Sequence, residues 1–187
     1  IMCAHLHGEL LNLSQLGRSL GRSHTALSGH LDILEESFVI RRLQPWHENL
    51  AKRQRKSPKL YIRDNGLLHT LLGIRDGASL RLHPSAGASW EGFVLEQILA
   101  HLRPDEAWFW QTQAGAELDL LTISGTGRTG FEMKLNESPR TTRSMHIAME
   151  DLRLDHLFVV HPGNLRFPLA EGITALPARE IPSLSKG

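Results

Sequence analysis

The residues that decide the fold, 117–135, read ELDLLTISGTGRTGFEMKL. An apolar run is followed by a stretch rich in glycine and threonine, and a second run then ends in Glu-Met-Lys. Because turn-forming glycines separate two runs of aliphatic, aromatic and β-branched residues, the stretch predicts consecutive strands over 117–124 and 130–135. The rest of the fold is predicted outward from this hairpin.

The polar residues of the hairpin fall into two groups. Residues two apart on a strand share a face, so Glu117 and Asp119 form one pair and Glu132 and Lys134 form another. Pairing of the strands then gathers three carboxylates and an ammonium group. Such a concentration of acids needs a compensating cation, and carboxylate oxygens suit Mg²⁺ or Mn²⁺, with Lys134 placed to orient a water or neutralise a leaving charge. The alternative is a solvated hairpin with cross-strand ion pairs.

Further elements are predicted on both sides of the hairpin. An amphipathic helix over 89–102 and a strand over 107–112 precede it, and a helix over 141–152 and a strand over 157–161 follow it. The order α-β-β-β-α-β, with helices against a mixed sheet, is typical of an α/β sandwich.

The N-terminal part predicts a different arrangement. A helix that starts at Ser14 ends near Gly21, and Ser23 caps a second helix with an apolar stripe. Strands over 38–43 and 60–62 follow, separated by a long basic loop. A helix-turn-helix followed by a hairpin is the winged-helix arrangement.

Two groups of residues in this part predict contacts with nucleic acid. The first is the polar start of the second helix, which a major groove would meet, and the second is the basic hairpin, suited to phosphates. The candidates are Arg22, His24, Thr25, Arg42, Lys52, Arg53, Arg55, Lys56 and Lys59. The alternative is a packing module whose cations form salt bridges with a neighbouring domain.

The stretch 75–87 is rich in Gly, Ser, His and Pro and predicts a linker. The domain boundary is therefore placed inside it. The sequence predicts a winged-helix domain over 1–76 and an α/β domain over 77–187.

Composition limits the class of protein. The 187 residues carry 21 basic and 20 acidic side chains, so the net charge of +1 indicates no partner by itself. The single cysteine, Cys3, rules out an internal disulfide and favours the cytoplasm, and no apolar run reaches the ~20 residues needed to span a bilayer. The eleven histidines lack a metal-binding spacing and are expected at the surface. A start at Ile1 suggests a piece of a longer protein.

An aspartate, a turn and then Glu-x-Lys on consecutive strands, after a helix with an acid, resembles the PD-(D/E)XK nuclease superfamily with its restriction-endonuclease-like fold. At longer range the chain resembles, from about Leu11 to Ile181, the C-terminal region of a large prokaryotic family of AAA+-type ATPases. The segments that carry this second resemblance are 31–38 (LDILEESF), 56–67 (KSPKLYIRDNGL), 90–94 (WEGFV) and 115–119 (GAELD).

The resemblance implies roles for four residues: Asp119 and Glu132 as ligands of Mg²⁺ or Mn²⁺, Lys134 as the catalytic lysine and Glu91 as the helix acid. The Pro-Asp dipeptide of the superfamily motif is absent, and Glu117-x-Asp119 stands in its place, which weakens the case for catalysis more than for the fold.

The implied parent protein has an ATPase domain on its N-terminal side, which would be the partner of this chain and the site of ATP binding. The phosphate-binding loop Gly-x-x-x-x-Gly-Lys-Ser/Thr does not occur here, so ATP hydrolysis is not expected of this chain.

The sequence therefore predicts one of two functions. The first is a Mg²⁺-dependent nuclease guided by the winged helix, with DNA the favoured substrate. The second is an inactive nuclease fold that binds DNA or protein for the ATPase. No membrane partner is expected, and oligomerisation stays open.

Overall fold

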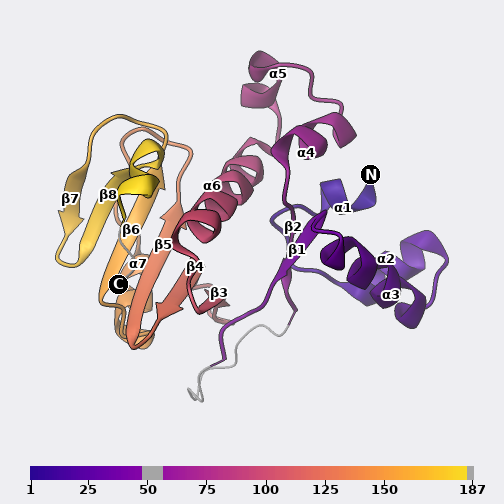
Figure 1. Ribbon diagram of the computed structural model, residues 1–187, viewed down its shortest axis with the longest axis horizontal. Helices are drawn as coiled ribbons and strands as arrows, with labels where there is room; N and C mark the ends of the chain where they lie inside the picture. The colour runs from indigo at the N-terminus through magenta and orange to yellow at the C-terminus, as the bar shows by residue number, and fades with distance from the viewer. Residues whose placement is uncertain (48–56, 185–187) are drawn as a thin grey trace. The chain divides into compact units, whose positions relative to one another are not determined.

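The computed structural model describes residues 1–47 and 57–184 (Figure 1). The chain divides into two compact units, Ile1–Leu43 with Ser57–Gly92 and Gln44–Lys56 with Phe93–Gly187. The last break between the units falls inside helix α6 (Ala86–Leu102), further along the chain than the compositional boundary between 76 and 77. No helix within 1–47 and 57–184 has both the length and the apolar character that a membrane span requires.

The first unit contains five helices and a two-stranded sheet among its described residues. They are α1 (Met2–His5), α2 (Leu13–Leu20), α3 (His24–Glu36), β1 (Ile40–Leu43), β2 (Lys59–Ile62), α4 (Asn65–Leu71) and α5 (Gly77–Leu82). The first residues of α6 complete the unit.

Local signals set the ends of the two central helices of this unit. The side chain of Asn12, and not Ser14 as predicted, accepts from the backbone N–H of Gln15 and caps α2. Gly21, with φ 61°, ends α2 in a left-handed conformation that costs glycine little. Ser23 caps α3 as predicted, because its hydroxyl accepts from the N–H of Ala26.

Strands β1 and β2 form an antiparallel pair with Ile40 opposite Ile62 and Leu43 opposite Lys59. Their apolar residues pack with the two central helices in one core, which contains Ala4, Leu11, Leu16, Leu27, Leu31, Ile40, Leu60, Ile62 and Leu68. The predicted sequence of two helices followed by a hairpin is therefore present in the first unit.

The second unit is built on a six-stranded mixed sheet with the order β3-β4-β5-β6-β8-β7. The pairs β5/β6 and β6/β8 are parallel and the other three are antiparallel. The strands are β3 (Glu106–Gln111), β4 (Glu117–Ser124), β5 (Gly127–Met133), β6 (His156–His161), β7 (Phe167–Ala170) and β8 (Ile173–Pro177), with helix α7 (Arg143–Asp151) before β6 and a 3-10 helix, η1 (Ala178–Ser183), after β8.

The predicted order α-β-β-β-α-β is confirmed as α6-β3-β4-β5-α7-β6. Several elements were not predicted, α5, β7 and β8 among them. The linker over 75–87 holds helix α5, which Asp76 caps by accepting from the N–H of Ser79. After residue 161 the chain adds β7 and β8, which extend the sheet beyond β6.

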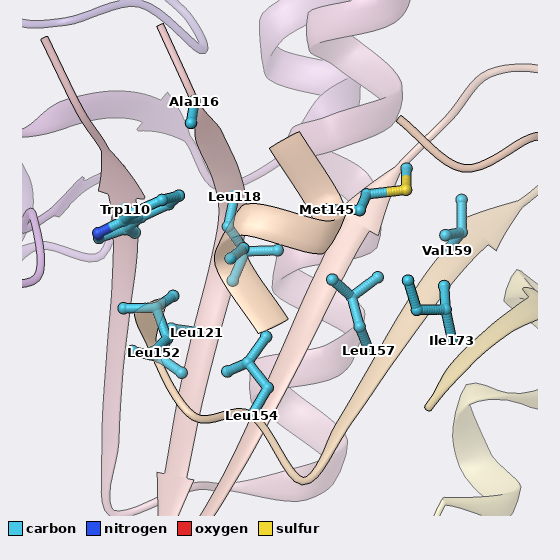
Figure 2. Packing of buried hydrophobic residues seen from close by; sticks show 11 residues of the cluster. Trp110, Ala116, Leu118, Leu121, Met145, Leu152, Leu154, Leu157, Val159 and Ile173 are labelled. Carbon is cyan, nitrogen blue, oxygen red and sulfur yellow. The ribbon is translucent and has the colours of Figure 1, made fainter. Parts of the chain in front are cut away.

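Helix α7 covers one face of this sheet (Figure 2). Met145 and Leu152 on the helix side lie among strand residues such as Leu118, Leu157 and Val159. Each buried aliphatic side chain contributes roughly 1.5–3 kcal/mol to the free energy of unfolding. This layer therefore stabilises the strands that carry the acidic residues.

Candidate functional site

Asp119 lies at an irregularity in the sheet. Trp108 pairs with Leu121 and Trp110 pairs with Leu118, so one residue of β3 faces two residues of β4, Asp119 and Leu120. This extra residue is a β-bulge, a feature that redirects side chains. Strict alternation along β4, which the sequence analysis assumed, does not hold at Asp119.

At the bulge the Asp119 carboxylate, and not a backbone carbonyl, accepts a hydrogen bond from the neighbouring strand β5. The regular β4–β5 pairing ends at Leu120 opposite Phe131, and Asp119 Oδ2 then accepts from the N–H of Met133 at 2.8 Å. Asp119 is 6% exposed. A buried carboxylate that accepts a backbone hydrogen bond is held in one position.

Glu132 is the next acid of the cluster and is only 2% exposed. The Lys134 ammonium lies 2.6 Å from Glu132 Oε1, and the lysine side chain is 39% exposed. The backbone N–H of Lys134 donates to the carbonyl of Val160, so the residue stays tied to β6 just beyond the end of β5. The buried Glu132 is thus ion-paired with a lysine that is partly exposed to solvent.

The pKa of Lys134 reports the charges around it. Burial acts to lower this pKa, but the negative charge of Glu132 and the hydrogen bond to it, together with the charges of Asp119 and Glu117, raise it above the ordinary 10.5. Because the folded pKa is the higher one, the stability that Lys134 contributes is fully present below its unfolded pKa and is lost as the pH rises through the folded pKa. Lys134 therefore carries its charge at neutral pH.

The three expected carboxylates do not form one metal-binding group in the described part of the chain. Glu117 accepts from the side-chain amide of Gln111 at 3.1 Å. Over residues 1–47 and 57–184, no three His, Cys, Asp or Glu side chains gather in a group able to hold a metal. Asp119 and Glu132 remain, and two carboxylates completed by waters and a phosphate are a usual setting for Mg²⁺. The donor set thus fits this ion.

Glu91, the predicted helix acid, is held within the first unit. Its Oε1 accepts from the hydroxyl of Tyr61 at 2.5 Å and from the ammonium of Lys59 at 3.0 Å. The side chains of Lys59 and Glu91 are 11% and 18% exposed, so the pair is largely buried. Neither of these partners of Glu91 was predicted from the sequence.

Two of the predicted nucleic-acid contacts are ion-paired inside the first unit. Lys59 pairs with Glu91, and the guanidinium of Arg42 contacts Asp32 at 2.7 Å and also Glu35. Burial acts to lower the pKa of Arg42, but its hydrogen bonds and ion pairs with Glu35 and Asp32 raise it. Both cations therefore join elements of the fold, and their predicted phosphate contacts stay a prediction.

Arg22, His24 and Thr25 are exposed at the start of α3, where the sequence analysis placed them. The other four candidates, Lys52, Arg53, Arg55 and Lys56, lie outside the described residues. The exposed start of α3 is thus the described part of the predicted nucleic-acid surface.

Two histidines expected at the surface are buried, His7 and His161. Burial lowers the pKa of His7, and its Nδ1 accepts from the N–H of Ile62, so Nε2 donates to the carbonyl of Ala88. His7 therefore bridges β2 and the first turn of α6, a role that its position in the sequence does not indicate.

Two families match separate parts of the chain. Domain of unknown function (DUF8612) matches residues 1–78, and Domain of unknown function (DUF4143) matches residues 86–181. No solved structure matches the chain.

Two curated relatives are similar over nearly the whole chain. They are described as uncharacterized protein Mb2031c of Mycobacterium bovis and uncharacterized protein Rv2008c of Mycobacterium tuberculosis. Each is 49% identical over 180 residues, which cover 96% of this chain and 41% of the relative. The chain thus spans less than half the length of the relatives it matches.

Proposed function

The chain belongs to the family of Domain of unknown function (DUF4143), and on that premise we propose that it is the nucleic-acid-processing part of a larger AAA+-type ATPase. In this proposal the first unit is a winged helix that binds DNA, and the second is a restriction-endonuclease-like unit that hydrolyses phosphodiesters with Mg²⁺. The relatives leave ample length for an ATPase domain, since this chain covers 41% of each.

The contact between Lys134 and Glu132 is the observation that carries the proposal. The Lys134 ammonium lies 2.6 Å from the buried Glu132, and Asp119 lies on the neighbouring strand. Metal-dependent hydrolysis by an Asp and Glu-x-Lys motif would need this arrangement. Glu132 lies near the end of β5, and the elements follow one another along the chain in the order α-β-β-β-α-β, which supports the proposed restriction-endonuclease-like fold.

Each side chain has a distinct role in the proposed hydrolysis. Asp119 and Glu132 would hold Mg²⁺, and the ion when bound would stabilise negative charge on the phosphate and activate a water. The Met133 amide fixes Asp119, and Glu132 fixes the ammonium of Lys134. Lys134, held by Glu132, would supply a positive charge that offsets the phosphate oxygens.

Cleavage of plasmid DNA tests the proposal. The purified chain is expected to nick supercoiled plasmid in Mg²⁺ or Mn²⁺ and to leave it intact in EDTA. Equal nicking in Mg²⁺ and in EDTA, or none in either, would contradict a metal-dependent nuclease.

The burial of the acids favours a second candidate, an inactive nuclease fold that binds DNA. Asp119 and Glu132 are almost fully covered, and each already holds a partner within the protein. DNA binding without metal-dependent nicking would select this function.

The DNA-binding surface predicts different effects for two arginines. Arg22→Gln is expected to reduce the slope of log affinity against log salt by about one, because an exposed cation at the start of α3 would contact a phosphate. Arg42→Gln is expected to leave the slope unchanged, because this cation is engaged by Asp32 and Glu35. Fluorescence anisotropy at several salt concentrations measures both, and an equal effect of the two substitutions would refute this surface.

A further inference from the structure

The second unit contains a pocket of about 270 Å³ that the proposed nuclease site does not use. The pocket lies beside the start of β5, and residues of that strand and of its neighbours β4 and β6 line it. Its polar lining consists of hydroxyl groups and one cation, and its apolar lining includes two aromatic rings. These groups belong to Thr122, Ser124, Thr129, Phe131, Phe158 and Arg166, among other lining residues.

The pocket lies on the opposite face of the sheet from Glu132. A Cβ atom on Gly130 would meet Leu154 at 2.6 Å and Leu157 at 3.4 Å, and both leucines belong to the core under α7. Gly130 and Glu132 therefore point toward the α7 face, while Thr129 and Phe131, one residue away, point to the other. The pocket is thus a separate site.

The hydroxyl groups come from paired positions of β4 and β5. Thr122 lies opposite Thr129, and Ser124 lies opposite Gly127 at the turn. A small residue at 127 leaves room in front of the two threonines. The Thr122 hydroxyl donates to the Thr129 carbonyl, whereas the hydroxyls of Ser124 and Thr129 can donate to acceptor atoms of a ligand.

Arg166 supplies the positive charge. Its guanidinium lies 5.8 Å from the centre of the Phe158 ring, and within 1–47 and 57–184 no acid is ion-paired with it. The charge of Arg166 also acts on His156, whose ring centre lies 4.4 Å from the centre of the Phe158 ring. The pKa of His156 is lowered first by burial and then by this charge. An anion in the pocket would offset this charge.

The two rings form the apolar wall. Phe131 and Phe158 stack with their centroids 5.7 Å apart, and Phe131 is fully buried. Ligand pockets of proteins commonly measure about 300–1,000 Å³ and combine apolar walls with a few convergent polar groups. This pocket is near the small end of that range, so it suits a compact molecule.

We propose that this pocket binds a compact organic anion. Its phosphate or carboxylate group would lie against Arg166 and the hydroxyls of Thr129 and Ser124, and its apolar part would lie against the phenylalanine rings. The site is independent of the nuclease proposal, since neither Asp119 nor Glu132 takes part.

Calorimetry with three probes tests the site. Phenyl phosphate and benzoate carry the two kinds of anionic group on the same ring, and benzyl alcohol is a neutral match. The wild-type chain is expected to bind at least one of the anions, at least tenfold more tightly than benzyl alcohol, and the stronger anion identifies the preferred group. Failure of both anions to bind, or equal binding of the alcohol, would overturn the proposal.

Substitutions locate the binding. Arg166→Gln is expected to weaken binding of the preferred anion at least tenfold, and Thr129→Val is expected to weaken it without removing the charge. Arg143→Gln, at an exposed position at the start of α7, is the matched control and is expected to bind as the wild type does. Thermal melting checks that each variant is folded, and equal affinities of folded Arg166→Gln and Arg143→Gln would overturn the assignment.

Discussion

Glu132→Gln and Lys134→Met are each expected to reduce Mg²⁺-dependent nicking of plasmid about 100-fold or more. Glutamine keeps the size of Glu132 but removes the negative charge that would hold the ion and that positions Lys134 at 2.6 Å. Methionine keeps most of the lysine stem and removes the ammonium group. The rate of conversion of supercoiled to open-circular DNA measures both effects.

The controls for these variants separate catalysis from folding. Glu150→Gln, on the exposed side of α7, removes one acid outside the cluster and is expected to nick at the wild-type rate. Lys134→Met leaves Glu132 buried without its cation, so thermal melting must accompany the assay. Equal rates for wild type, Glu132→Gln and Lys134→Met would show that the nicking does not come from this cluster.

Gly92→Ala is expected to lower the free energy of unfolding by about 2 kcal/mol, within the range of overpacked cores. A Cβ atom at residue 92 would lie 2.4 Å from His7 Nε2 and 3.4 Å from Tyr61. The His7 ring cannot move aside freely, because Ile62 and Ala88 hold both of its nitrogens. Urea denaturation followed by circular dichroism measures the loss.

Gly87→Ala is the matched control on the same helix. A Cβ atom at residue 87 meets nothing within 4 Å, so the substitution should gain the ordinary preference of a helix for alanine, about 1 kcal/mol or less. A Gly92→Ala protein as stable as the Gly87→Ala protein would refute the contact with His7.

The regular elements of the second unit could be predicted because their signals are local. The strand over 117–124 has the predicted bounds, and the helix predicted over 89–102 begins only three residues earlier, at Ala86. Alternation and helical periodicity depend on neighbouring residues, which a sequence displays directly. The short strands β7 and β8 were missed because one of them contains Pro168 and neither shows a long apolar run.

The details of the candidate site depend on partners far apart in the sequence. The bulge at Asp119 is set by the pairing of β4 with β3, and alternation along one strand cannot reveal it. Likewise, the charge of Lys59 is visible in the sequence, but its partner Glu91 lies 32 residues away. The positive charge at residue 59 could therefore be predicted, whereas its ion pair with Glu91 could not.

The central claim is that Asp119 and Glu132 hold a divalent ion beside Lys134. Anomalous diffraction from crystals of the chain soaked in Mn²⁺ tests it most directly. The account predicts one strong peak within about 2.0–2.4 Å of an oxygen of each carboxylate, and its loss in Asp119→Asn crystals. Crystals that bind Mn²⁺ only elsewhere, or that show no peak at this pair at saturating Mn²⁺, would contradict it.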